Sequence, residues 1–335
     1  MGKKKKYISK SSAKDKKRKR ISSVLLYIFL GQIVFWLAAG FYLFFYKSPD
    51  IIYVFPENPK QGDTVFIRVK SKTDNITGNF ENKKLVFYRK CKLNEWVYFL
   101  GIDAGHNPGQ YKISVDTGGI QPLTKEIIVA LADFSSAEPV PAPSARQTGI
   151  TQIKAVDNII KNDNPVLKKV LSDFTQEPYF NSPFSFPLGE MEKRGFSFGK
   201  LINFAQYKLQ HFGVDLKAPE KTEVYAINDG KVVLTVNLSN YGKTVIIDHG
   251  LDIFSLYLHL DEIKVSEGQM VVRSQLIGLS GDTGYTTAPH LHFSVRVGAA
   301  RVDPIVFIET TKKLEDNFIL ADISQAFLNI FNNFK

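Results

Sequence analysis

The chain has 335 residues, enough for two or three domains, and its hydrophobic share of 44% is ordinary for a globular protein. Its net charge of +10 lies at one end, because residues 1–20 hold eleven Lys and Arg against Asp15 alone. The rest of the chain is therefore neutral. The single cysteine, Cys91, excludes an intrachain disulfide and a closed thiolate zinc site.

A basic tail of this length would suit nucleic acid, but an uncharged apolar run follows it. Residues 24–46 contain only Gln32 as a strongly polar residue, and at about 1.5 Å per residue they cover a hydrocarbon core of about 30 Å. We predict a cytoplasmic tail over 1–22 and a transmembrane helix over 23–46, and no nucleic-acid partner. Positively charged residues next to a membrane span stay on its cytoplasmic side. The protein is therefore expected to cross the cytoplasmic (inner) membrane once, with everything after the helix extracytoplasmic.

A cleaved signal peptide is the alternative interpretation of the same run. The run is longer than a usual signal core, and it continues through bulky Phe41, Tyr42, Phe44 and Phe45 past its only small-residue pair. The anchor is therefore favoured.

Short runs rich in β-forming residues, separated by turn signals, fill residues 50–132. Five or more such strands at this spacing predict a small β-sandwich. His106 lies in a Gly/Asn/Pro turn, where we expect an ordinary solvent-facing histidine. The runs cover residues 65–69, 84–88, 96–100, 111–115 and 126–130.

Residues 133–182 are expected to connect this region to the next. The stretch up to Gly149 is rich in Ser, Ala and Pro, which favours an extended linker. From Ala155 to Phe174 apolar residues recur near helical spacing, interrupted at residues 162–165, so we predict two short helices with Pro165 opening the second. The pattern leaves open whether they pack on the back of the following domain, cover its cleft, or merely connect.

Two short strings carry the residue types of a metal site: His211-Phe-Gly-Val-Asp215 and Ala288-Pro-His290-Leu-His292-Phe293. In a β-strand, alternate side chains share a face, so the two strings could together hold one divalent ion between imidazole nitrogens and a carboxylate. That donor set suits zinc, and catalytic zinc sites keep three protein ligands and one position for water. The helical HExxH pattern is absent from the sequence.

The sequence between these strings predicts an all-β sheet, because strand patterns are punctuated by glycines with no helical pattern between them. Beyond Pro304, apolar residues at helical spacing predict an amphipathic helix within residues 311–335. We expect it to pack on the protein itself rather than on a membrane or partner. The strands are expected at residues 224–226, 231–236, 244–247 and 254–259.

The same segment resembles the lysostaphin/LytM-type zinc peptidases over roughly residues 184–308. That family's HxxxD, Tyr-x-His-Leu and HxH motifs correspond to His211–Asp215, Tyr257-Leu-His259-Leu260 and His290-Leu-His292. Glycine-containing strings at 230–233, 242–250 and 278–284, and Val302-Asp-Pro304, also fall in order. The resemblance implies a duplicated-hybrid-motif fold over residues 183–310. The strand region before it resembles the immunoglobulin-like module that precedes some of these peptidases.

The resemblance also implies roles. His211, Asp215 and His292 would bind one Zn²⁺, His290 would be the general base, and His259 would hydrogen-bond the transition state, although these last two roles could be exchanged. Tyr207 would either stabilise the oxyanion or, as we favour, simply pack.

The implied substrate is the peptide cross-link of bacterial peptidoglycan. Two alternatives share the fold: a non-enzymatic regulator of cell-wall amidases, and a structural component of an envelope complex. Protein partners would then bind the β-sandwich or the C-terminal helix.

Overall fold

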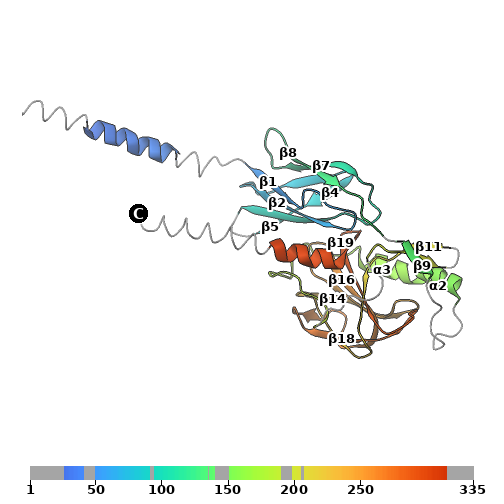
Figure 1. The fold of residues 1–335 in the computed structure, drawn as a ribbon. Helices are drawn as coiled ribbons and strands as arrows, with labels where there is room; N and C mark the ends of the chain where they lie inside the picture. The colour runs from blue at the N-terminus through green and yellow to red at the C-terminus, as the bar shows by residue number, and fades with distance from the viewer. Residues whose placement is uncertain are drawn as a thin grey trace, which may run out of the picture. The chain divides into compact units, whose positions relative to one another are not determined.

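The computed structural model describes residues 26–40, 50–90, 94–134, 136–139, 151–189, 198–204 and 207–314 (Figure 1). The chain divides into two units, Met1–Asp50 and Ile51–Lys335. In the first, residues 26–40 are helical and expose large apolar side chains, such as Phe29 and Trp36. The helices in the described ranges all fall short of the length and apolarity that a membrane crossing needs. The predicted tail over 1–22 and both ends of the predicted span over 23–46 lie outside these ranges.

The second unit begins with two four-stranded antiparallel sheets, ordered β1-β2-β6-β5 and β4-β3-β7-β8. They share one core that includes Val65, Ile67, Leu85 and Ile113, and we call them the N-terminal sheet pair. Four of the five predicted runs each fall on one strand, the run at residues 84–88 is divided between β4 and β5, and β1 and β3 were not foreseen. That the pair is an immunoglobulin-like sandwich stays a prediction. The strands are β1 Ile51–Phe55, β2 Thr64–Lys70, β3 Thr77–Phe80, β4 Lys83–Val86, β5 Tyr88–Lys90, β6 Glu95–Gly101, β7 Gly109–Asp116 and β8 Leu123–Val129.

The connector contains structure that the sequence did not predict. Part of the expected linker, β9 (Ser136–Pro139), pairs with β10 (Leu201–Phe204), which pairs in turn with β11 (Tyr207–Gln210). A strand that ends on a proline fits this place because β9 lies at the edge of its three-stranded sheet.

The two predicted short helices are present, the second with Pro165 in its first turn, but a π-helical turn joins them into one continuous segment where an interruption was expected. It consists of α2 (Gln152–Asn158), the π-helical turn η2 (Ile159–Asp163) and α3 (Asn164–Val170). Pro165 lies in the first turn of α3, directly after the π-helical turn, and this irregular turn is where the helix accommodates a residue that has no N–H to donate. We call residues 152–170 the helical strap.

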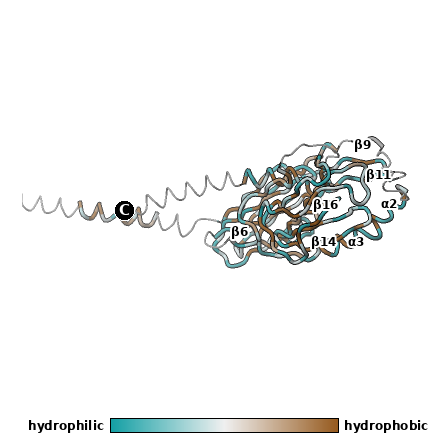
Figure 2. The backbone as a smooth tube through the Cα atoms, turned by 90° about the horizontal axis from the view of Figure 1, so that it is seen from below, coloured by the Kyte–Doolittle hydropathy of each residue, from teal (hydrophilic) through white to brown (hydrophobic). Residues whose placement is uncertain are grey.

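The remaining strands form a nine-stranded sheet in which β12-β19-β16-β15-β14-β17 are neighbours. Its interior is mostly apolar, with Tyr257 and Phe293 fully buried, and Figure 2 shows apolar chain gathering about β16 with hydrophilic chain outside. The mainly β architecture is thus confirmed. The strands are β12 Val214–Leu216, β13 Glu223–Tyr225, β14 Gly230–Leu238, β15 Gly242–Asp248, β16 Ile253–Ile263, β17 Met270–Val271, β18 Leu276–Ser280, β19 Leu291–Val297 and β20 Ala300–Val302.

A helix over residues 304–314 follows β20. A C-terminal helix was expected to start at residue 311. The observed helix begins earlier, because Asp303 caps it by accepting hydrogen bonds from the backbone N–H groups of Ile305 and Val306. The rest of the predicted amphipathic helix, residues 315–335, lies outside the described residues.

The N-terminal sheet pair and the nine-stranded sheet are in direct contact. Phe66 and Phe99 belong to the core of the larger sheet. Asp103 binds Arg301 through a 2.8 Å bond from Nε, a 2.5 Å bond from Nη2 and a 2.9 Å bond from the backbone N–H. The guanidinium of Arg301 in turn lies 3.8 Å over the ring of Phe212, next to the first predicted ligand.

Candidate metal centre

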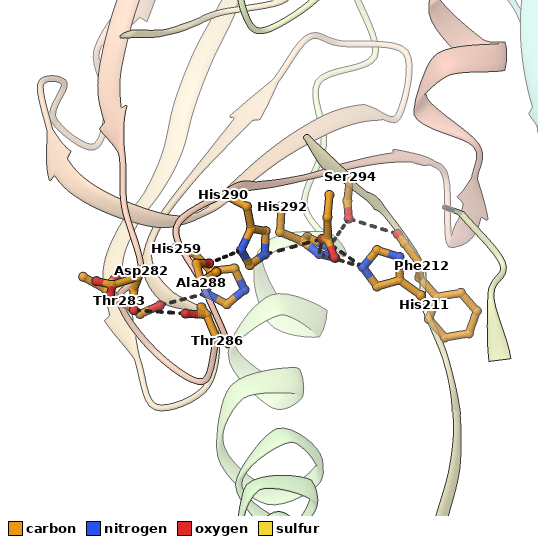
Figure 3. A network of polar contacts seen from close by, with 11 residues as sticks. His211, Phe212, His259, Asp282, Thr283, Thr286, Ala288, His290, His292 and Ser294 are labelled. Carbon is orange, nitrogen blue, oxygen red and sulfur yellow. Dashed lines mark hydrogen bonds and ion pairs between the residues drawn. The ribbon is translucent and has the colours of Figure 1, made fainter. Parts of the chain in front are cut away.

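Three side chains that are distant in sequence converge at one end of the nine-stranded sheet. The Nδ1 atom of His292 lies 3.0 Å from Nε2 of His211 and 2.9 Å from Oδ1 of Asp215, and His211 Nε2 lies 3.1 Å from the same carboxylate oxygen. One ligand atom from each residue falls within 4.8 Å of the others. The structure therefore brings together the three residues predicted to bind the metal (Figure 3).

These distances fit a zinc ion. A tetrahedral ion with bonds of about 2.0–2.1 Å holds its ligand atoms about 3.3 Å apart. Two imidazole nitrogens and a carboxylate oxygen also match the donors that zinc prefers in catalytic sites. The donor set and its spacing thus suit zinc, and the binding roles of the individual residues remain predictions.

Two neighbouring strands set this geometry. In the antiparallel pairing of β12 with β19, Asp215 lies directly opposite His292. His211 was expected on the same strand as Asp215, and this is wrong, because residues 211–213 lie between β11 and β12. The chain passes close to β19 there. A Cβ atom on Gly213 would lie 2.5 Å from His292 Nε2, so only glycine fits.

Burial and mutual contact tune the charges of the site. Burial by itself would raise the pKa of Asp215, but the ion pair and hydrogen bond with His211, together with those to His292, hold it well below its usual range. Burial lowers the pKa of His292 to about 4, against the opposing effect of Asp215. An ionised carboxylate and a neutral imidazole are the protonation states that a metal requires.

Two further histidines stand beside these three, with ring centroids 4.9 Å apart. His290 Nδ1 lies 2.8 Å from the carbonyl oxygen of Ala288, and His259 Nδ1 lies 2.8 Å from that of Thr283. Because a carbonyl only accepts, each Nδ1 carries the proton and each Nε2 keeps its lone pair. His290 Nε2 lies 3.6 Å from Asp215 Oδ1, so its free nitrogen faces the centre.

His259 is held in an uncommon backbone conformation. Its φ of 61° is left-handed, and close to it the register of β16 shifts in the pairings with β15 and with β18. Such strain is costly in a non-glycine residue and is concentrated at functional sites. Burial, followed by the nearby charges of His290 and His292, lowers the pKa of His259 to about 3, so its imidazole is neutral at pH 7.

The helical strap contacts both sequences that flank the site. Ala155 and Val156 of α2 pack against Tyr207 and Leu209 on β11 and against Tyr285 in the loop that leads to His290. Asp163 of the strap accepts hydrogen bonds from the backbone N–H groups of Ser239 (3.2 Å) and Asn240 (2.8 Å). The strap therefore lies on the side of the domain that carries the loop. Tyr207 packs against it.

Sequence reasoning missed the groups that orient the histidines. The carbonyls of Ala288 and Thr283 carry no signal in the sequence, because any residue supplies a carbonyl. Ser294, whose Oγ lies 3.0 Å from His292 Nε2, did carry one. It is two residues beyond His292 on a strand, so it shares the same face.

Residues 209–304 match the model of peptidase family M23. This segment is a peptidase family M23 domain. Peptidases of this family depend on zinc, in agreement with the His–Asp–His donor set.

Curated relatives match over the M23 domain. The chain is 48% identical over 87 residues to peptidoglycan DD-endopeptidase ShyA of Vibrio cholerae serotype O1, which covers 26% of the chain and 20% of that protein. It is 36% identical over 104 residues to DD-carboxypeptidase/endopeptidase Mpg of Neisseria meningitidis serogroup B. That match covers 31% of the chain and 24% of the relative. The chain therefore spans a quarter or less of these two relatives.

A solved structure, a putative peptidase M23 from Pseudomonas aeruginosa, matches beyond the M23 domain. It aligns with a TM-score of 0.52 and 24% identity over 76% of this chain and 95% of that one. The likeness shows a shared fold.

Proposed function

We propose that this chain is a membrane-anchored zinc metalloendopeptidase that hydrolyses peptide cross-links of bacterial peptidoglycan. The observation that carries the proposal is the convergence of His211, Asp215 and His292, with two imidazoles that present free Nε2 atoms beside them. The substrate class rests on the M23 domain and on relatives described as peptidoglycan endopeptidases.

The chemistry is divided between the metal and the two histidines beside the predicted ligands, His259 and His290. A zinc ion held by His211, Asp215 and His292 would lower the pKa of water and polarise the scissile carbonyl. His290 is the proposed general base, because its Nδ1–H is held by the Ala288 carbonyl and its Nε2 faces the centre, where it can take a proton from the attacking water. The same imidazole can then deliver that proton to the leaving nitrogen.

His259 is proposed to hydrogen-bond the transition state from beside His290, with the two ring centroids 4.9 Å apart. Its Nδ1–H is held by Thr283, so its ring position is fixed before substrate binds. Burial keeps the ring neutral in the resting protein, so its Nε2 would act as an acceptor for a hydrogen bond from the attacking water or from the N–H of the leaving amine.

Membrane anchoring is proposed from the first unit. The apolar run of residues 24–46 carries no charge, and the part described as helical exposes its large side chains. Following the basic tail, it would hold the chain in the cytoplasmic membrane with the M23 domain outside. Full-length protein should sediment with membranes, and protein lacking residues 1–46 should not. Recovery of both proteins in the soluble fraction would refute the anchor.

Digestion of purified peptidoglycan tests the enzymatic proposal. The zinc-loaded protein should release peptides that have gained one water at a cross-link, identified by mass spectrometry. His290→Ala should be slower by about 100-fold or more, the usual contribution of a general base. His106→Ala is the matched control, because this histidine lies in the N-terminal sheet pair against Glu81, and it should retain full activity. Equal digestion by wild type and His290→Ala would refute the mechanism.

A further inference from the structure

Ser294 connects β19, which carries His292, to the segment at residues 211–213, which carries His211. Its hydroxyl lies 3.0 Å from Nε2 of His292, on the side of the ring opposite the metal-facing Nδ1. The same hydroxyl donates a 2.9 Å hydrogen bond to the backbone carbonyl of Phe212, the residue after His211 (Figure 3). One side chain therefore touches both a ligand and the backbone next to another ligand.

The chemistry of a hydroxyl then decides the tautomer of His292. A serine has one proton to donate, and here it goes to the Phe212 carbonyl, which only accepts. Towards His292 the serine oxygen must act as the acceptor, so Nε2 carries the imidazole proton. In a neutral ring that leaves Nδ1 with its lone pair, which accepts from the Nε2–H of His211, 3.0 Å away; the same His211 nitrogen lies 3.1 Å from the Asp215 carboxylate oxygen.

Within the described residues, Ser294 Oγ is the acceptor that close packing offers this Nε2–H. Ser294 is 2% exposed, and the backbone at Gly213 approaches so closely that an added Cβ would lie 2.5 Å from both His292 Nε2 and Ser294 Oγ. A buried N–H without an acceptor costs about 1–3 kcal/mol. Without the hydroxyl, the ring would instead favour the tautomer with its proton on Nδ1, which would donate to Asp215 and obstruct the metal.

We propose that Ser294 is a positioning residue of the metal centre, which selects the Nε2–H tautomer of His292 and so prepares Nδ1 to bind zinc. The inference rests on the zinc site of the proposed function but goes beyond it, since it concerns a residue that touches neither metal nor substrate. Partners of this kind typically account for about 10- to 100-fold in metal affinity.

Zinc affinity measures the effect directly. In competition with a chromophoric chelator at pH 7, the full-length Ser294→Ala protein should bind zinc about 10- to 100-fold more weakly than wild type. Ser294→Thr, which keeps the hydroxyl, should bind within about threefold of wild type. Ser255→Ala is the matched control, because Ser255 Oγ lies 2.7 Å from Nε2 of His249, a second buried Ser–His pair away from the three ligands. It should lower the melting temperature without changing zinc affinity.

The tautomer of His292 can be measured in the wild-type protein, independently of the variants. The chain contains six histidines, so ¹⁵N-histidine labelling gives few signals. In metal-free protein at pH 7, His292 should show its proton on Nε2.

The outcomes separate this inference from the proposed function. Wild-type affinity in Ser294→Ala, an equal loss in Ser294→Thr, or a proton on Nδ1 of metal-free His292 would each overturn the role of Ser294 while leaving the zinc site intact. Failure of the wild-type protein to bind zinc would instead refute the proposed function itself.

Discussion

His249 lies in the core of the nine-stranded sheet, outside the metal centre, and makes the stability of the protein depend on pH. Its ring is fully buried, with Nδ1 2.7 Å from the Asp229 carbonyl and Nε2 2.7 Å from Ser255 Oγ. The ring of Phe184 packs edge-on against it, with centroids 5.2 Å apart. Burial lowers the pKa of this imidazole from 6.5 to about 4, although the Asp229 carbonyl opposes the effect.

The size of the effect follows from the two pKa values. The unfolded chain takes up a proton on His249 near pH 6.5, whereas the folded protein resists it until about pH 4. The stabilisation is therefore complete above pH 6.5 and is lost as the pH falls from 6.5 towards 4. At about 1.4 kcal/mol per pH unit, the gap between the two values corresponds to about 3 kcal/mol.

Urea unfolding between pH 7 and pH 4 tests this reasoning. Wild-type free energy of unfolding should fall across the range, and His249→Gln, which cannot titrate, should fall by about 3 kcal/mol less. The comparison of slopes removes the uniform cost of the substitution and the contributions of the other histidines, which both proteins share. Parallel pH profiles for wild type and His249→Gln would refute the argument.

Three other substitutions test the strap, the contact between the sheets and the metal centre. Asp163→Ala should lower the free energy of unfolding by about 2–3 kcal/mol, because it leaves the partly buried N–H of Ser239 and the buried N–H of Asn240 without an acceptor; an unchanged urea midpoint would contradict this. Asp103→Ala should cost about 1–2 kcal/mol, since the ion pair with Arg301 is partly exposed, and thermal melting of the variant would reveal the loss. Asp215→Ala should weaken zinc binding at least about 100-fold in chelator competition while the fold persists in circular dichroism; retained affinity would exclude it as a ligand.

The sequence alone predicted the main features of the M23 domain. Period-two alternation and glycine punctuation are local properties, so the strands around β14, β15 and β16 could be placed from them. The ligand motifs were also readable, because zinc chemistry restricts the donors to few residue types, and these stood at recognisable spacings around His211 and His292. The structure brings those two residues within 3.0 Å of each other, as expected.

Tertiary structure decided what local patterns do not encode. The bend at residues 211–213 exists because the backbone there passes against His292 and Ser294, and the continuous helical strap exists because Asp163 finds its hydrogen-bond donors in a distant turn. Tertiary structure also decided how His259 and His290 are oriented, because backbone carbonyls hold their Nδ1 atoms. Sequence determined which groups are present, whereas the direction of each lone pair depends on neighbours that only the folded chain brings into contact.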